Sequence, residues 1–351
     1  MSRSTAPVLL LCGYYGEHNL GDDALLQVLL QSLPKHASLK ITAHDQDEVQ
    51  LLAPQAHIIR RRSLWDMLTA ALEADILILG GGSLLQDGTS FHSLLYYLAL
   101  ITLTRLRRRR VLLWGQGLGP LHRALSRWLV HGALSFCTAA SWRDPGSFEL
   151  ARRWAPNLPM RMAADPVWQM PSQDWVGGGA IILSWRLSDL LDAIRWRTLL
   201  QALDGLASRL ETSVCWMAFH RDQDSSLLKR LVQRQLVPHR LLARSTTMIP
   251  RSPNAVFELV KTARLVLPMR LHALILARLS GCPMIALSYD PKVESAAALA
   301  KVPCIRLDEL PSVESLVVQW EKEVDREVEQ HVIDQIRFNA SAHNDILAQW
   351  V

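Results

Sequence analysis

The sequence predicts an α/β protein built from two doubly wound domains that face each other across a cleft. Short apolar runs that end in glycine or polar residues alternate with segments whose apolar residues recur every three or four positions. This alternation favours parallel sheets covered by helices on both faces. The pattern restarts after a stretch rich in proline and glycine, and 351 residues are enough for two hydrophobic cores.

The apolar runs and the helical spacings place the expected elements along the chain. In the first half, strands are expected at Val8–Cys12, Ile58–Ile59, Asp75–Leu79, Val111–Trp114 and Ala139–Trp142. In the second half, they are expected at Ala180–Ser184, Ser213–Phe219, Leu265–Pro268, Met284–Ser288 and Cys304–Leu307. Helices are expected at about Asp23–Leu33, Leu94–Leu106, Trp196–Leu210, Ser225–Gln235, Pro253–Lys261, Leu271–Arg278 and Lys292–Leu299.

The expected domain bounds follow from the proline and glycine stretch. The first domain is expected at 1–165, a linker at 166–179 and the second domain at 180–312. A final charged segment with helical spacing, 313–351, fits a return to the first domain. Two domains joined by such a linker are typical of enzymes that bind a substrate between them.

Composition and charge limit the classes of partner. A net charge of +5 on 351 residues does not require nucleic acid, and none is expected. An anionic substrate and an acidic membrane surface fit this charge equally well. Five scattered cysteines without a C-x-x-C pair, and an N-terminal apolar run too short for a signal peptide, indicate a cytoplasmic protein. No apolar stretch reaches the roughly 20 residues that span a bilayer.

A glycine-rich turn follows the first expected strand and leads into a helix. Gly13, Gly16 and Gly21 can adopt a positive φ, and Asn19 or Asp22 can cap the helix that follows. The free N–H groups of a first helical turn favour an anion. The spacing is neither G-x-G-x-x-G nor the P-loop pattern, so a standard dinucleotide or ATP site is not supported.

Two further glycine clusters follow expected strands of the same sheet. The segment Asp75–Asp87 begins with an apolar run that leads into Gly80-Gly81-Gly82-Ser83. The segment Trp114–Pro120 contains three glycines. Ser141–Asp144 ends a fourth strand and adds a cation and a carboxylate. Because parallel strands end at one edge of a sheet, these clusters indicate a ligand cleft there.

The second half carries arginine and histidine at the ends of its expected strands. Arg186 follows one strand, His220 follows another, and Arg270 and His272 open a helix after a third. Arginine is shaped for bidentate contact with phosphate or carboxylate, and histidine is the natural proton donor or acceptor beside it. A structural histidine bonded to the backbone is the alternative for His272, but its place beside Arg270 at a strand-to-helix turn favours function.

Six segments together resemble one enzyme family. They are Gly13-Tyr14-Tyr15-Gly16 with Asn19–Ala24, Gly80–Asp87, Gly115–Pro120, Ala164-Asp165-Pro166, Arg270–Leu274 and Tyr289–Val293. In this order they resemble the polysaccharide pyruvyl transferases, in particular the bacterial and cyanobacterial branch that acts on cell-surface polysaccharide. The resemblance implies two Rossmann-like domains in the GT-B arrangement and phosphoenolpyruvate as donor. It also implies a sugar acceptor, lipid-linked or free, in cell-wall polysaccharide of the kind used for S-layer anchoring.

The resemblance also assigns roles to residues. It places the family's Arg-x-His motif on Arg270 and His272, with Leu271 between them, and a second donor-binding arginine on Arg186. His272 would be the acid that protonates the methylene carbon of phosphoenolpyruvate, and the arginines would bind its two anionic groups. The base stays open among Asp22, Asp23, Asp87 and Asp144, with Asp22 and Asp23 favoured as catalytic residues. Further substrate-binding residues are expected at Gly13, Tyr15, Asn19, Gly81, Gly82, Ser83, Asp87, Arg143, His220 and Lys292. No metal and no cofactor besides the donor are expected.

Several of these residues also have structural explanations. Asp22 and Asp23 lie where acidic side chains favour a helix dipole, Asp87 can hold its own turn, and Arg143 can pair with Asp144. Two other functions remain open: a glycosyltransferase that uses a sugar nucleotide, and a non-catalytic carbohydrate- or anion-binding protein.

A basic run follows the apolar helix in the first half. It consists of Arg105 and Arg107–Arg110. Such a run is typical of a solvated helix end, and it also fits peripheral contact with anionic lipid at the inner face of the membrane, since each charge contributes about 1 kcal/mol there.

Overall fold

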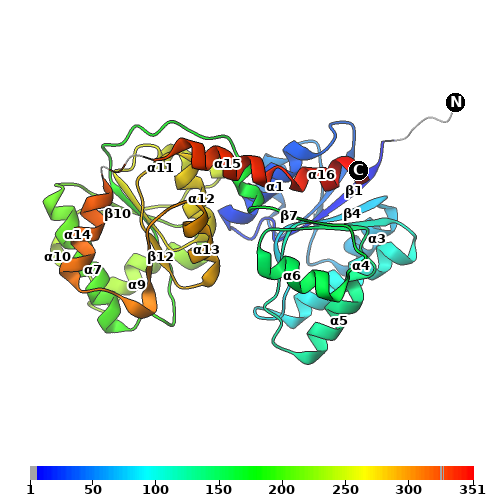
Figure 1. Ribbon diagram of the computed structural model, residues 1–351, viewed down its shortest axis with the longest axis horizontal. Coiled ribbons are helices and arrows are strands. Elements are labelled where there is room, and N and C mark those ends of the chain that lie inside the picture. The colour runs from blue at the N-terminus through cyan, green and yellow to red at the C-terminus, as the bar shows by residue number, and fades with distance from the viewer. Residues whose placement is uncertain (1–5, 325, 327) are drawn as a thin grey trace. The chain divides into compact units, whose positions relative to one another are not determined.

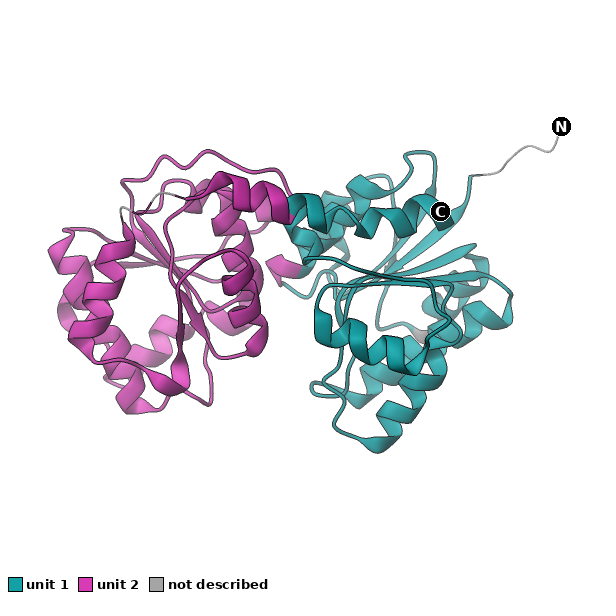
Figure 2. Cartoon of the chain, in the orientation of Figure 1, with its two compact units in different colours: residues 1–18, 22–169, 337–351 teal, residues 19–21, 170–336 magenta. Residues whose placement is uncertain are grey.

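The computed structural model describes residues 6–324, 326 and 328–351, which group into two compact units (Figure 1, Figure 2). Unit 1 contains the described residues of 1–18, 22–169 and 337–351, and unit 2 contains 19–21 and the described residues of 170–336. The chain passes from unit 2 to unit 1 inside helix α15 (Gln330–Ala340), so the last helix, α16 (His343–Trp350), belongs to unit 1.

Unit 1 is built on a seven-stranded parallel sheet with the strand order β3-β2-β1-β4-β5-β6-β7. The strands are β1 (Val8–Cys12), β2 (Ser38–Ala43), β3 (His57–Arg60), β4 (Ile76–Leu85), β5 (Arg110–Leu118), β6 (Ala139–Trp142) and β7 (Met160–Met162). Because β1, β4, β5 and β6 are parallel neighbours, their carboxyl ends meet at one edge of this sheet.

Helices cover both faces of this sheet. They are α1 (Leu20–Ser32), α2 (Gln46–Leu52), α3 (Leu64–Glu73), α4 (Phe91–Leu106), α5 (Ala124–Leu134) and α6 (Pro145–Trp154). Helices α3 to α6 pack on one face, and α1 and α16 lie over the other (Figure 1). Among the described residues, no helix combines the length and the apolar character needed to cross a membrane.

Unit 2 has a four-stranded parallel sheet, β10-β9-β8-β11, and a parallel pair, β12-β13. Its strands are β8 (Ile181–Ser184), β9 (Val214–Met217), β10 (Ser245–Met248), β11 (Leu265–Pro268), β12 (Ala286–Ser288) and β13 (Cys304–Arg306). Its helices are α7 (Ala193–Arg209), α8 (Arg221–Asp224), α9 (Leu227–Gln233), α10 (His239–Ala243), α11 (Pro253–Val260), α12 (Leu271–Leu279), α13 (Pro291–Leu299) and α14 (Val313–Val324). The N–H of Ile285 donates to the carbonyl of Val266 at 3.2 Å and joins the parallel pair to β11.

The predicted α/β class with two parallel sheets is confirmed, but two of the predicted glycine turns are wrong. Gly80–Gly82 lies inside β4, and Gly115–Gly117 lies inside β5. The strands continue because their glycines take unusual conformations instead of ending the ladder: Gly81 and Gly82 have φ values of +79° and +78°, and the pairing register shifts after Gly82.

A buried histidine in α16 makes the stability of unit 1 depend on pH. His343 Nε2 lies 2.8 Å from the carbonyl oxygen of Ala164, and its ring lies against Trp114. Burial lowers the pKa of His343 from 6.5 to about 4 and outweighs the opposing hydrogen bond to Ala164 and the nearby Asp165. Between these two values the unfolded chain binds a proton that the native unit does not bind. The free energy of unfolding is therefore expected to fall as the pH is lowered from about 6.5 to about 4.

Chemical denaturation at a series of pH values measures this dependence. The matched variant is His343→Gln, because glutamine can reach a hydrogen bond but does not titrate. We expect a flatter profile in this variant between pH 4 and 6.5. An unchanged slope would show that another group is responsible.

Candidate functional site

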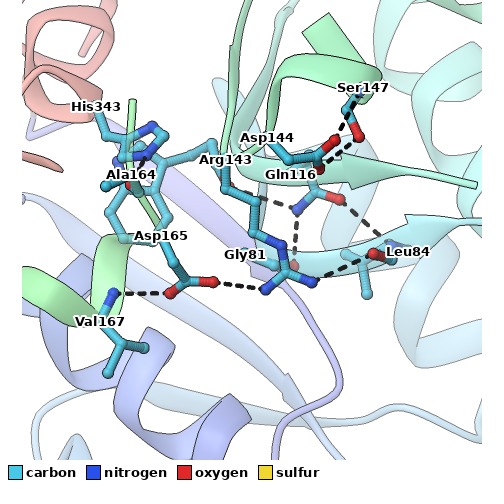
Figure 3. A network of polar contacts seen from close by, with 12 residues as sticks. Gly81, Leu84, Gln116, Arg143, Asp144, Ser147, Ala164, Asp165, Val167 and His343 are labelled. Carbon is cyan, nitrogen blue, oxygen red and sulfur yellow. Dashed lines mark hydrogen bonds and ion pairs between the residues drawn. The ribbon is translucent and has the colours of Figure 1, made fainter. Parts of the chain in front are cut away.

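The carboxyl edge of the unit 1 sheet holds a buried ion pair (Figure 3). Arg143, which directly follows β6, donates from Nη1 to Asp165 Oδ2 at 2.8 Å and from Nη2 to Ser83 Oγ at 3.3 Å. Asp165 Oδ1 accepts the N–H of Val167 at 3.0 Å. The partner of Arg143 is therefore Asp165 and not the adjacent Asp144, which corrects the suggested pairing.

Asp144 has a local structural role. Its carboxylate accepts the N–H and the hydroxyl of Ser147, each at 2.7 Å, and so caps α6 (Figure 3). Both carboxylate oxygens of Asp144 are therefore engaged in the helix cap. Asp144 is therefore disfavoured as the base that the sequence left open.

The side chain of Gln116 holds the distorted part of β4 in place (Figure 3). Its Nε2 donates to the carbonyls of Leu79 at 3.1 Å and Gly81 at 2.8 Å, and its Oε1 accepts the N–H of Leu84 at 3.4 Å. These bonds replace ladder bonds that the glycines lose. Sequence reasoning did not select Gln116 as a site residue. The signal that could have found it is a single amide between glycines in an otherwise apolar strand.

The two acidic residues of α1 lie in its first turn, and both are buried. Asp22 Oδ1 would lie 3.6 Å from a Cβ placed on Gly82. The bare backbone of Gly82 therefore borders this carboxylate, so Asp22, Gly82 and the neighbouring Ser83 come together in unit 1. Asp23 shares the turn.

Tyr15 is a core residue, which disfavours its expected role in substrate binding. Its hydroxyl donates to the carbonyl of Gly80 at 2.6 Å, and burial raises its pKa well above 10. Its ring leaves no room for a side chain at Gly13, where a Cβ would lie 2.3 Å from Tyr15 Cζ. Of the three glycines expected to adopt a positive φ, Gly16 does so at +68°, while Gly13 and Gly21 are kept small by their neighbours.

Asp87 is also held by backbone groups. Its two carboxylate oxygens accept the N–H of His122 at 2.7 Å and of Arg123 at 2.9 Å. Burial alone would raise the pKa of Asp87, but the nearby Ser126 hydroxyl and these N–H groups outweigh it and lower the pKa to about 2. This carboxylate organises the loop before α5 and is disfavoured as a base.

In unit 2, a buried carboxylate clamps the arginine of the Arg-x-His motif. Asp224 Oδ2 accepts Arg270 Nε at 2.7 Å and its Oδ1 accepts Arg270 Nη2 at 2.6 Å. Nη2 also donates to Gln223 Oε1 at 3.0 Å, and Asp224 Oδ2 accepts the N–H of His220 at 2.8 Å. The side chain of Arg270 is 11% exposed, and that of Asp224 is 2% exposed. The pair fixes the guanidinium in one orientation, and Asp224 is a residue that sequence reasoning missed.

His272 lies in the first turn of α12, two residues after Arg270, and is partly exposed. The segment 19–21, which belongs to unit 2, lies directly against it: a Cβ on Gly21 would be 2.0 Å from His272 Nδ1. The N–H of Leu20 donates to the carbonyl of Phe219 at 3.2 Å, and Asn19 forms a backbone bridge with His220. Asn19 Oδ1 accepts the N–H of Gly21 at 3.2 Å, as the expected cap of α1. The structure thus brings Asn19, His220 and His272 together.

Arg186 follows β8 and borders a cavity of about 680 Å³ in unit 2. Its guanidinium lies 4.9 Å from the centre of the Tyr289 ring, and Nη1 donates to the Tyr289 hydroxyl at 3.1 Å. Arg234 lines the same cavity, so two cations border it, and sequence reasoning missed the second. Leu271 is the first residue of α12, and Lys292 lies in the first turn of α13, where its N–H donates to Asp290 Oδ1 at 2.9 Å.

Among the described residues, one group could hold a cation. His18 Nε2 lies 3.4 Å from Asp45 Oδ2 and 3.8 Å from Glu48 Oε2. Asp45 also caps α2 through the N–H of Glu48. Helix capping and ion pairing account for this arrangement, so we assign it no function.

The family model for polysaccharide pyruvyl transferase matches residues 19–291. No curated protein matches the sequence significantly.

Solved structures with the same fold cover almost the whole chain. A putative UDP-N-acetylglucosamine 2-epimerase from Listeria monocytogenes has a TM-score of 0.63 at 13% identity over 98% of this chain and 95% of its own. Anabaena HepE, in complex with UDP and glucose, has a TM-score of 0.62 at 12% identity over 98% of both chains. A UDP-glucosyltransferase from Polygonum tinctorium has a TM-score of 0.58 at 10% identity over 98% of this chain and 99% of its own. At these identities the similarity establishes a GT-B-like fold.

Proposed function

The chain belongs to the polysaccharide pyruvyl transferase family, and from this membership we propose that it transfers the pyruvyl group of phosphoenolpyruvate to a sugar. The acceptor is a sugar of a cell-surface polysaccharide or its precursor. The product is a pyruvate ketal that bridges two hydroxyls of that sugar, and phosphate is released. The proposed place of the reaction is the cytoplasm, in line with the scattered cysteines that lack a C-x-x-C pair.

The Arg270–Asp224 pair beside His272 is the observation that best supports this proposal. Phosphoenolpyruvate carries a phosphate and a carboxylate, so its site needs fixed cations. Nε and Nη2 of Arg270 donate to Asp224, and Nη2 also donates to Gln223. In the part of the chain that is described, Nη1 of Arg270 makes no hydrogen bond. We assign Nη1 to one anionic group of the donor and Arg186, at the cavity in the same unit, to donor binding as well.

His272 is the proposed general acid. It delivers a proton to the methylene carbon of phosphoenolpyruvate, which leaves C2 with cationic character. A sugar hydroxyl forms a bond to C2, the C2–O bond to phosphate breaks, and the second hydroxyl then attacks C2 to close the ketal. The free N–H groups at the start of α12 add stabilisation for the anionic donor.

Asp22 and Asp23 are the proposed candidates for the base that accepts the hydroxyl proton. Asp87 accepts two backbone N–H groups, and Asp144 accepts the N–H and the hydroxyl of Ser147, so both are used in local caps. Asp22 borders the bare backbone of Gly82. Gly81, Gly82, Ser83 and Arg143 are proposed to line the acceptor side.

The test is release of phosphate from phosphoenolpyruvate in the presence of lipid-linked and nucleotide-linked sugars, with mass spectrometry of each product. We expect release that depends on the acceptor, together with a mass gain equal to a pyruvate ketal. No release, combined with thermal stabilisation by a sugar nucleotide but not by phosphoenolpyruvate, would favour a glycosyltransferase instead.

A further inference from the structure

Two neighbouring helices in unit 1 carry several exposed apolar side chains. On α4 and α5, which pack side by side, Leu106 is 76% exposed, Trp128 is 70% exposed and Leu125 is 54% exposed. Leu95 in α4 is exposed as well, and so is Phe136, which lies just beyond the end of α5. We call Leu95, Leu106, Leu125, Trp128 and Phe136 the α4/α5 face. Single exposed apolar residues are common, but five on one pair of packed helices favour an interaction surface.

A groove of about 500 Å³ runs between these helices. It is lined by Leu98, Thr102, Trp128, Leu129, His131, Gly132, Ala133, Ser135, Phe136 and Trp154. Apart from the histidine, none of these side chains is ionisable. The groove therefore offers an apolar cavity next to the exposed tryptophan, and it lies on the helical layer and not at the carboxyl edge of the sheet that carries the site residues.

The charged residues in the segment that forms the α4/α5 face are all basic. The segment Gly88–Arg143, which contains both helices, holds no aspartate or glutamate. Arg105, Arg107 and Arg108 at the end of α4 are exposed, and within the described residues none of them forms an ion pair. The next two arginines are already used, because Arg109 pairs with Asp75 at 2.8 Å and Arg110 donates to the carbonyl of Trp350 at 2.8 Å. At least three exposed arginines without a described ion pair, Arg105, Arg107 and Arg108, thus border the α4/α5 face.

We propose that the α4/α5 face docks on a bilayer that contains anionic lipid. Apolar side chains beside a cluster of arginines match the headgroup boundary, where the apolar groups enter the acyl region and the cations meet anionic headgroups. Tryptophan favours this boundary because its ring is apolar and its N–H is polar. A second copy of this chain fits less well, since a two-fold contact would bring two sets of arginines together.

This docking surface does not depend on the proposed reaction. If both hold, the acceptor is a sugar attached to lipid at that membrane, and the docking surface brings the enzyme to it. Vesicle binding needs neither donor nor acceptor, so a failure of the docking proposal and a failure of the transfer proposal are measured separately.

Flotation of the full chain with vesicles tests the proposal. We expect wild type to float with vesicles of phosphatidylcholine and 30% phosphatidylglycerol, and to stay behind with phosphatidylcholine alone. Replacing all three of Arg105, Arg107 and Arg108 by glutamine is expected to lower the partition coefficient for these vesicles about 100-fold, because each lost charge lowers it about 5-fold. Trp128→Ser removes the most exposed aromatic side chain of the face and is expected to weaken binding about 10-fold or more. Its exposed position leaves the fold intact.

Two matched controls separate the face from general effects. Arg197, Arg230 and Arg240 in unit 2 are exposed, and their joint replacement with glutamine removes the same net charge elsewhere. Phe338→Ala removes an exposed aromatic from α15. Both controls should float like wild type. Failure of wild type to float, or equal loss in the controls, overturns the proposal. A dimer in solution that Trp128→Ser dissociates would assign the face to self-association and overturn it as well.

Discussion

Replacing Asp224 with asparagine is expected to lower the free energy of unfolding of unit 2 by about 3–5 kcal/mol. The carboxylate is almost fully buried and forms two hydrogen bonds to the Arg270 guanidinium. Asparagine keeps the shape but removes the charge, so Arg270 is left buried without its counter-charge. Hydrogen exchange of α8 and α12, together with denaturant unfolding, measures this loss within unit 2.

The same substitution is expected to reduce kcat/KM for phosphoenolpyruvate about 100-fold, because a small misplacement of a binding group has an effect of this size. Asp224 acts in this account as a positioning residue, through Arg270. The loss should therefore appear mainly in KM for the donor, and the acceptor KM should change little. A purely structural role would lower the amount of active enzyme and leave both KM values unchanged.

The double variant Asp224→Asn/Arg270→Gln distinguishes stability from function. Removing both charges eliminates the unpaired buried cation, so stability should return to within about 1–2 kcal/mol of wild type. Activity should not return, since the guanidinium that is proposed to bind the donor is gone. If the double variant regains activity, Arg270 does not bind the donor.

The fold was predictable where strands are apolar throughout. The runs Val8–Cys12 and Leu265–Pro268 match β1 and β11 residue for residue, because a strand buried on both faces of a parallel sheet is apolar at almost every position. The run Ala139–Trp142 matches β6 as well, although it contains the buried Ser141. The strands β2, β7 and β10 were not predicted. β7 and β10 lie at sheet edges and are largely exposed, and β2 places Lys40 between apolar residues, so none of the three gives a continuous apolar run.

The site was predictable where its residues are neighbours in the chain. Arg270 and His272 stand together in one motif, but Asp224 lies 46 positions before Arg270. Nothing in the sequence separates Asp224, which is buried, from Asp222, which is exposed. The same holds for Arg143, because the sequence offers Asp144 as the nearest carboxylate and tertiary folding brings Asp165 to it instead. Long-range pairing of charges is decided by burial, which local patterns do not contain.

Replacing His272 with glutamine is expected to reduce kcat by a factor of about 10²–10⁴. Glutamine can form a hydrogen bond but cannot deliver a proton to the methylene carbon of phosphoenolpyruvate. His272 is only partly buried, so the variant should unfold within about 1 kcal/mol of wild type. Single-turnover measurement of phosphate release, at saturating donor and acceptor, reads the chemical step directly. Activity within tenfold of wild type would move the acid role to another residue.

Gly21→Ala tests the position of this acid without removing it. Gly21 lies in the first turn of α1 and lacks a positive φ, so alanine favours the helix there by up to about 1 kcal/mol. Its Cβ would lie 2.0 Å from His272 Nδ1, however, and the imidazole must move to make room. We expect a folded protein whose kcat falls at least 100-fold, which thermal unfolding and the phosphate assay measure together. Equal losses of kcat in Gly21→Ala and in His272→Gln would mean that catalysis requires the imidazole of His272 in its present orientation. A fully active Gly21→Ala enzyme would instead mean that His272 can deliver its proton from another rotamer, and that this glycine serves only the packing of 19–21.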